Sequence, residues 1–145
     1  MPDQSIRTPW HLWAVGGVLT AFNALGAFDY VMSVSQGEDY FRSSGMTDAQ
    51  VAYFSSVPIW ATAAWTISVW AGLFGGVLLM LRHKLAPLML AFCVLGTAAY
   101  AFYTLVLSEG REAMGALWFM PLLVTVLTTL AAAYSSAMAK RGVLR

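Results

Sequence analysis

The sequence predicts an all-α, polytopic membrane protein in which four transmembrane helices form a bundle and both termini lie in the cytoplasm. Of its 145 residues, 59% are hydrophobic and 10% are charged, whereas a soluble domain carries about 25% charged residues. The length leaves room for one domain, residues 1–145, and most of it falls in four apolar stretches of membrane-spanning length. This composition excludes a soluble enzyme domain, a disordered tail and a disulfide-rich secreted module.

The first predicted span covers residues 10–31, begins after Pro9 and contains two polar residues, Asn23 and Asp29. One alternative stays open for this stretch, because residues 24–26 resemble the small-residue cleavage site of a signal peptide. The apolar stretch is longer than a typical signal core, and Asn23 has a use inside a helix bundle. We therefore expect the first span to be retained.

Three further spans are predicted over residues 58–81, 85–107 and 113–139, the last with a kink at Pro121. Each span is long enough to cross ~30 Å of hydrocarbon. Because backbone groups in lipid must find hydrogen-bond partners within their own segment, these stretches are expected to be helices.

Residues 32–57 form the largest region predicted to lie outside the bilayer. The first part of this region, residues 33–39, is predicted to be a loop. A short helix is expected over residues 48–54, because Thr47 suits the N-cap and Gln50 occupies the capping-box position.

The distribution of cations predicts the orientation. On one side of the four-span arrangement lie Arg7, Arg82, Lys84, Lys140, Arg141 and Arg145, and on the other lie Arg42 and Arg111. Lysine and arginine accumulate in cytoplasmic loops. Both termini share a side with the larger group and are therefore expected in the cytoplasm.

Small residues recur at helical spacing in several spans, a pattern that lets helices approach closely in a membrane. The second span contains Ala64, Ser68, Gly72 and Gly76, the first contains Gly16, Thr20, Asn23 and Ala27, and the last contains Thr125, Thr129, Ala132 and Ser136. We interpret these stripes as helix-packing faces. The stripe on the second span is longer than a four-helix monomer requires, which indicates packing against a partner.

Two interpretations are open for Asn23, which lies ~20 Å along the first span from Trp10, well inside the hydrocarbon. The structural interpretation is an interhelical hydrogen bond to Thr66, Ser68 or a threonine of the last span. The functional interpretation is a polar contact for a small solute. The structural one is favoured, because a modest packing role is enough to keep an amide away from lipid.

Asp29 lies close to the outer boundary of the first span, where a carboxylate can reach water. We expect this carboxylate to pair with Arg111 or Arg42, or to line an acidic vestibule with Glu109 or Glu112. No second carboxylate lies deep in any span, which argues against a proton relay.

The motifs of common enzyme classes are absent from the sequence. It contains no His-Glu-x-x-His pair, no Gly-x-Ser-x-Gly elbow and no phosphate-binding glycine loop. The single cysteine, Cys93, excludes dithiol chemistry. We therefore predict no catalytic residues, no metal ligands and no cofactor, and the net charge of +1 favours no nucleic-acid partner.

Residues 10–13 (WHLW) and 22–32 (FNALGAFDYVM) resemble a family of small four-span proteins from Gram-negative bacteria that genomes often label "sugar transporter". Residues 52–54, Pro58 and residues 65–72 continue the resemblance, which covers about the first half of the chain. The resemblance implies a location in the bacterial inner membrane and adds some support for transport.

Two functions follow from these observations. The favoured one is a small inner-membrane protein without catalysis that acts through helix packing as an accessory or assembly partner. Its partners would be the lipid bilayer and either a second copy or a larger membrane complex. The alternative is an oligomeric component of a transporter for a small, sugar-like solute, in which the solute is contacted by Asn23, Asp29, Thr125 and Thr129.

Overall fold

The computed structural model describes residues 6–145, in which every regular element is a helix. Four helices are long and apolar enough to cross a membrane: α1 (Trp10–Gln36), α4 (Ile59–Met80), α5 (Ala86–Phe102) with the π-helical turn that continues it (Tyr103–Leu107), and α7 (Met120–Lys140). The prediction of an all-α protein with four membrane-spanning helices is confirmed.

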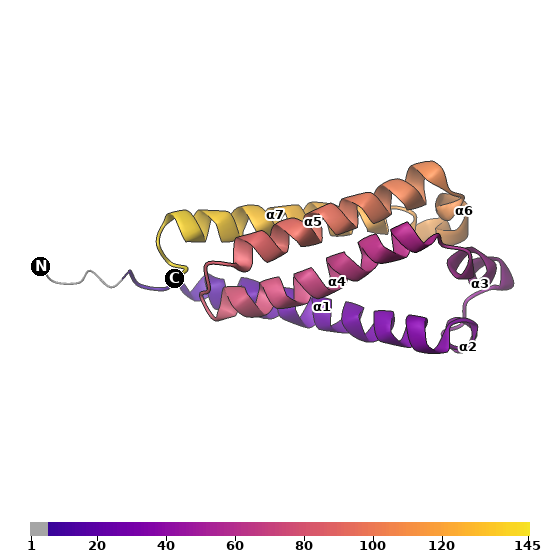
Figure 1. Cartoon of the computed structure of the whole chain (residues 1–145), viewed down its shortest axis with the longest axis horizontal. Coiled ribbons are helices and arrows are strands. Elements are labelled where there is room, and N and C mark those ends of the chain that lie inside the picture. The colour runs from indigo at the N-terminus through magenta and orange to yellow at the C-terminus, as the bar shows by residue number, and fades with distance from the viewer. Residues whose placement is uncertain (1–5) are drawn as a thin grey trace, which may run out of the picture.

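The two ends of the bundle differ (Figure 1). The end that we call the loop end carries the short helices α2 (Glu38–Ser43), α3 (Asp48–Ser55) and α6 (Gly110–Met114) and a 3-10 turn (Gly115–Leu117). The opposite end, which we call the terminal end, carries residues 6–9, the turn at residues 81–85 and residues 141–145.

The segment after the first span is more helical than expected. The loop predicted over residues 33–39 is wrong, because α1 continues to Gln36 and α2 begins at Glu38. Gly37 separates the two helices at a φ of +55°, a backbone conformation that favours glycine. The hydropathy falls after Val31 because the side chains become polar there, although the helix itself continues.

The fourth span begins later than expected. The residues predicted to start it, 113–119, instead form the end of α6, the 3-10 turn and a connecting turn, and α7 begins at Met120. Gly115, at a φ of +55°, ends α6. Pro121 lies in the first turn of α7, where its missing N–H breaks no helical hydrogen bond. The kink predicted at this proline is therefore wrong.

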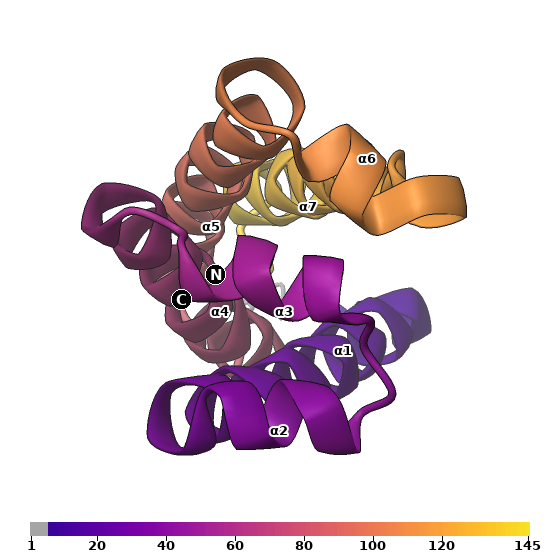
Figure 2. The ribbon, with the colours of Figure 1, turned by 90° about the vertical axis from the view of Figure 1, so that its right-hand side faces the viewer.

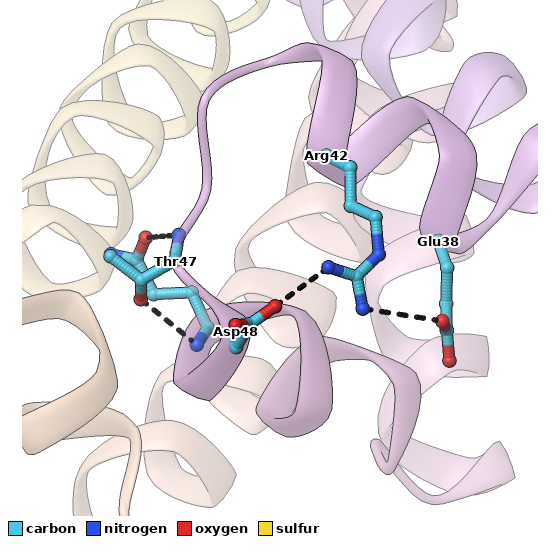
Figure 3. Close-up of polar contacts among 5 residues, drawn as sticks. Glu38, Arg42, Thr47 and Asp48 are labelled. Carbon is cyan, nitrogen blue, oxygen red and sulfur yellow. Dashed lines mark hydrogen bonds and ion pairs between the residues drawn. The ribbon is translucent and has the colours of Figure 1, made fainter.

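Helix α3 begins at the cap that the sequence indicates (Figure 3). The backbone N–H of Gln50 donates to Oγ1 of Thr47 at 3.3 Å, and the backbone N–H of Thr47 donates to Oε1 of Gln50 at 3.0 Å. The helix ends at Ser55, one residue beyond the expected end.

The four long helices form a row in the order α1, α4, α5 and α7, in which each helix packs mainly on the next. At the α1–α4 seam the facing pairs are Gly16 with Met80, Thr20 with Gly76, and Asn23 with Gly72. A Cβ atom on Gly76 would lie 3.0 Å from the backbone nitrogen of Thr20, so the two backbones are in contact.

Helix α5 packs against α4 along the neighbouring side of the same stripe. The facing pairs at the α4–α5 seam are Gly75 with Leu90, Gly72 with Cys93, and Gly96 with Ala64 and Ser68. A Cβ atom on Gly96 would lie 2.6 Å from the carbonyl oxygen of Ala64. The stripe of Ala64, Ser68, Gly72 and Gly76 is thus occupied by α1 and α5 of the same chain.

Helices α1 and α7 stand at the two ends of the row and meet at the terminal end. A buried apolar cluster joins them there, formed by Leu12, Leu79, Ala86, Met138, Val143 and Leu144. The imidazole of His11 on α1 is also hydrogen-bonded to the hydroxyl of Tyr134 on α7. Toward the loop end the ribbons of α1 and α7 diverge (Figure 1).

Candidate functional site

The divergence of α1 and α7 leaves a cavity of about 720 Å³ in the half of the bundle toward the loop end. All four long helices line it, together with α2, α3 and α6. The lining extends from Asn23 and Cys93, which are buried, to Val34 and Glu38, which are exposed. Cavities that bind small molecules commonly measure about 300–1,000 Å³, so this one has the size of a ligand site.

The wall of the cavity is mainly apolar and contains a few polar groups. Its large side chains include Phe22, Phe41, Phe54, Trp65, Val69 and Tyr100. Its hydrogen-bonding and charged side chains include Asn23, Asp29, Ser33, Glu38, Ser68, Thr97 and Thr128. An apolar wall with a small number of polar groups is typical of sites that bind small molecules.

Asn23 lies at the deep end of the cavity and is 6% exposed. Its side-chain amide donates to the carbonyl oxygen of Leu19 in the same helix at 2.9 Å. The interhelical hydrogen bond expected for Asn23 is therefore not formed, because the amide bonds one turn back along its own helix. Oδ1 of Asn23 packs against Gly72 of α4, and within residues 6–145 no donor bonds to it.

The inner face of α7 differs by one position from the predicted stripe. Thr129 is exposed, and the hydroxyls of Thr125 and Thr129 donate to backbone carbonyls one turn back in α7. Thr128, at 3% exposure, lines the cavity instead, with its Oγ1 3.3 Å from Oγ1 of Thr97 on α5. Of these three threonines, Thr128 lines the cavity, and Thr125 and Thr129, which the sequence indicated as solute contacts, do not.

Asp29 lies at the mouth of the cavity and makes neither of the predicted ion pairs. The hydroxyl of Tyr40 on α2 donates to Oδ1 of Asp29 at 2.8 Å. This hydrogen bond to a carboxylate raises the pKa of Tyr40 above its ordinary value, with smaller contributions from desolvation and the negative charge. The second carboxylate at the mouth is Glu38, and neither Glu109 nor Glu112 lines the cavity.

The two arginines expected beside Asp29 are engaged elsewhere. Arg42 lies between two carboxylates, 2.6 Å from Asp48 and 3.9 Å from Glu38 (Figure 3). The hydrogen bond to Asp48 is the main cause of the raised pKa of Arg42. The guanidinium of Arg111 lies 5.0 Å from the ring centroid of Trp118, in a cation–π contact.

Helix α3 lies across the loop end of the bundle, between α1 and α7 (Figure 2). Phe54 and Ser55 at its carboxyl end line the cavity. Two other side chains of α3 contact the segment after α5. Gln50 donates to the carbonyl oxygen of Ala113 at 3.0 Å, and the hydroxyl of Tyr53 is 2.8 Å from that of Ser108. The helix thus covers part of the mouth and is held to the α5–α6 side by two side chains.

Several lining residues are not among the sequence-based candidates. Trp65, Thr97 and Tyr100 line the cavity from α4 and α5. Thr97 and Tyr100 lie four and seven residues after Cys93, which is buried. This helical spacing is the sequence signal that could have marked one face of the third span.

Comparison with known protein families, curated proteins and solved structures finds no match for this chain. The chemistry of the cavity must therefore be argued from its own residues. Within residues 6–145 no three histidine, cysteine, aspartate or glutamate side chains are grouped as metal ligands. The cavity offers hydroxyls, the side chain of Asn23 and two carboxylates in a mainly apolar wall, an arrangement that can orient a bound molecule.

Proposed function

We propose that this protein is a membrane-embedded, non-enzymatic binding component for a small solute, the alternative that the sequence left open. The solute would occupy the cavity between α1 and α7. The observation that carries the proposal is the cavity of about 720 Å³, whose mainly apolar wall contains a few polar side chains, among them Asn23, which is only 6% exposed. Such a wall is typical of sites that bind and orient small molecules.

The helix-packing function has lost its main support. The sequence favoured it because the stripe on the second span is longer than a monomer requires. Gly76 and Gly72 in that stripe face α1, and Ser68 faces Gly96 of α5. A stripe that is filled within one chain gives no reason to expect a partner helix there.

We place the protein in the bacterial inner membrane with both termini cytoplasmic. This placement rests on the resemblance of the first half of the chain and on the six cations at the terminal end. The mouth of the cavity then faces the outer side of that membrane.

Transport would require more than the cavity itself, because the terminal end is closed by the apolar cluster and by the hydrogen bond between His11 and Tyr134. A solute that enters from the loop end can pass through only if α1 and α7 separate there, or if a second copy completes a path. An oligomer or a larger membrane complex is therefore part of this proposal.

Two glycines of α1 supply a matched test of binding. Gly26 lines the cavity, and a Cβ atom there would meet only Val69 at 4.0 Å, whereas a Cβ atom on Gly17 would meet nothing within 4 Å. Gly26→Leu should therefore fill the cavity without disturbing the seam, and Gly17→Leu should add the same side chain outside the cavity. The leucine improves helix propensity equally at both positions.

The measurement is native mass spectrometry after gentle detergent extraction from the membrane. We expect a non-covalent small molecule on the wild type and on Gly17→Leu, and its loss from Gly26→Leu. The proposal fails if wild type carries no such molecule, or if Gly26→Leu retains it at the wild-type level.

A further inference from the structure

The charges at the mouth of the cavity have a single sign. Asp29 and Glu38 are the charged side chains that line it, and no lysine, arginine or histidine among the described residues does so. Both carboxylates are exposed, and Glu38 is the first residue of α2.

The nearest cation leaves this negative charge largely uncompensated. Arg42 approaches Asp48 to 2.6 Å and Glu38 only to 3.9 Å, and Asp48 lies outside the cavity (Figure 3). Asp29 receives a hydrogen bond from the neutral hydroxyl of Tyr40 and forms no ion pair within the part of the chain that the structure describes. A cation at the mouth would therefore meet one free carboxylate and one weakly paired carboxylate.

Below the mouth the wall of the cavity is uncharged and mainly apolar. Phe41 and Phe54 lie near the mouth, and aromatic faces attract cations as well as apolar groups. Trp65 and Val69 line the cavity from α4, where Trp65 packs edge-to-face on Tyr30 and Val69 lies opposite Gly26 of α1. Asn23 and Asp29 are six residues apart on α1, which corresponds to ~9 Å along the helix.

We infer that the ligand of this cavity is a cationic amphiphile, with its positive head beside Asp29 and Glu38 and its apolar body between α1 and α7. This inference rests on the proposed function, because it names the class of molecule that the cavity holds. The body reaches toward Asn23 at the deep end of the cavity.

Three probes with the same tail and different heads test the charge. Decyltrimethylammonium, decyl maltoside and decyl sulfate, each radiolabelled, are titrated onto the protein in phosphatidylcholine nanodiscs, and binding to empty nanodiscs is subtracted. We expect the cation to bind at least about tenfold more tightly than the neutral and anionic probes, the ratio expected for one or two charge contacts at a solvated mouth.

Neutralising variants separate charge from shape. The double variant Asp29→Asn, Glu38→Gln should weaken binding of the ammonium probe about tenfold and leave binding of the maltoside unchanged. Glu112→Gln removes an exposed carboxylate at the same end but outside the cavity, and it should change neither. The unchanged maltoside affinity also shows that the double variant is folded.

The outcomes that overturn the inference differ from those that overturn the proposed function. Equal affinity for all three probes, or tighter binding of the sulfate, contradicts a cationic ligand. If Gly26→Leu abolishes the binding of these probes, the proposal that the cavity binds a small molecule still stands. Failure of every probe to bind saturably contradicts the cationic amphiphile, and the native mass spectrum then decides whether the cavity binds anything.

Discussion

The terminal half and the loop half of this bundle are built from the same four helices but are packed in opposite ways. In the terminal half, backbones touch at Gly76 and Thr20, and α1 is joined to α7 by an apolar cluster and by His11 and Tyr134. In the loop half, α1 and α7 separate around a cavity, and side-chain hydrogen bonds from Tyr40, Gln50 and Tyr53 hold α2 and α3. The difference lies between α1 and α7, which are joined in the terminal half and leave a cavity in the loop half, whereas α5 packs closely on α4 in both halves.

The largest expected effect comes from disrupting the packing of α1 on α4 in the terminal half. Gly76→Leu places a side chain where even a Cβ atom would lie 3.0 Å from the backbone of Thr20, so the α1–α4 seam must separate. We expect a loss of about 3 kcal/mol or more in the free energy of unfolding, the size typical of severe overpacking. Thermal unfolding in detergent measures it.

Gly17→Leu is the control for that measurement, because a Cβ atom on Gly17 meets nothing within 4 Å. Its unfolding temperature should equal or slightly exceed that of wild type, since leucine is the better helix former. If Gly76→Leu and Gly17→Leu lower the free energy of unfolding equally, the α1–α4 seam does not stabilise the terminal half.

A smaller effect is expected from destabilising α3, the helix that covers part of the mouth in the loop half. Thr47→Ala removes the side-chain half of the capping box of α3 and should cost about 1 kcal/mol locally. Amide hydrogen exchange should then become faster in residues 48–55, while exchange in α4 and α5 stays unchanged. Equal acceleration in α4 would mean that α3 and the packed half unfold together.

The smallest expected effect is a titration at the mouth. The pKa of Tyr40 is raised mainly by its hydrogen bond to Asp29, so Asp29→Asn should lower that pKa toward the ordinary value of a tyrosine. Ultraviolet absorbance of the phenolate follows the titration, and Tyr40→Phe identifies the contribution of this residue. An unchanged titration would show that α2 is not held to α1 by this contact.

The spans and the start of α3 could be predicted because hydropathy and capping are local properties of the chain. The capping box at Thr47 and Gln50 needs only residues three apart. The end of α1 could not be predicted in this way, because hydropathy reports where side chains become polar and the helix continues to Gln36. Gly37, with its φ of +55°, was the better signal for that end.

The candidate site was predicted only in part. Asn23 and Asp29 were singled out because polar residues within a span are conspicuous, and both line the cavity. The predicted packing face of α7 is one position away from the buried face. Thr125 and Thr129 have the same helical spacing of small residues as Thr128 and Ser135, so the sequence does not distinguish the two faces. The cavity itself depends on how far α1 diverges from α7, and no local pattern contains that distance.

The contrast between the halves is tested most directly on α7, where Thr128 lines the cavity and Ser135 lies in the packed half. Both residues are buried, at 3% and 0% exposure, and seven residues separate them, so they lie on the same face of one helix. Each is replaced by cysteine in a Cys93→Ala background, and reaction with N-ethylmaleimide in membrane vesicles is followed by intact mass.

The cysteine at position 128 should react at least about tenfold faster than the cysteine at position 135, because access controls the reaction of otherwise similar thiols. Adding Gly26→Leu should slow the reaction at position 128 and leave position 135 unchanged. Equal rates at the two positions would contradict an open loop half, and with it the binding cavity on which the proposed function depends.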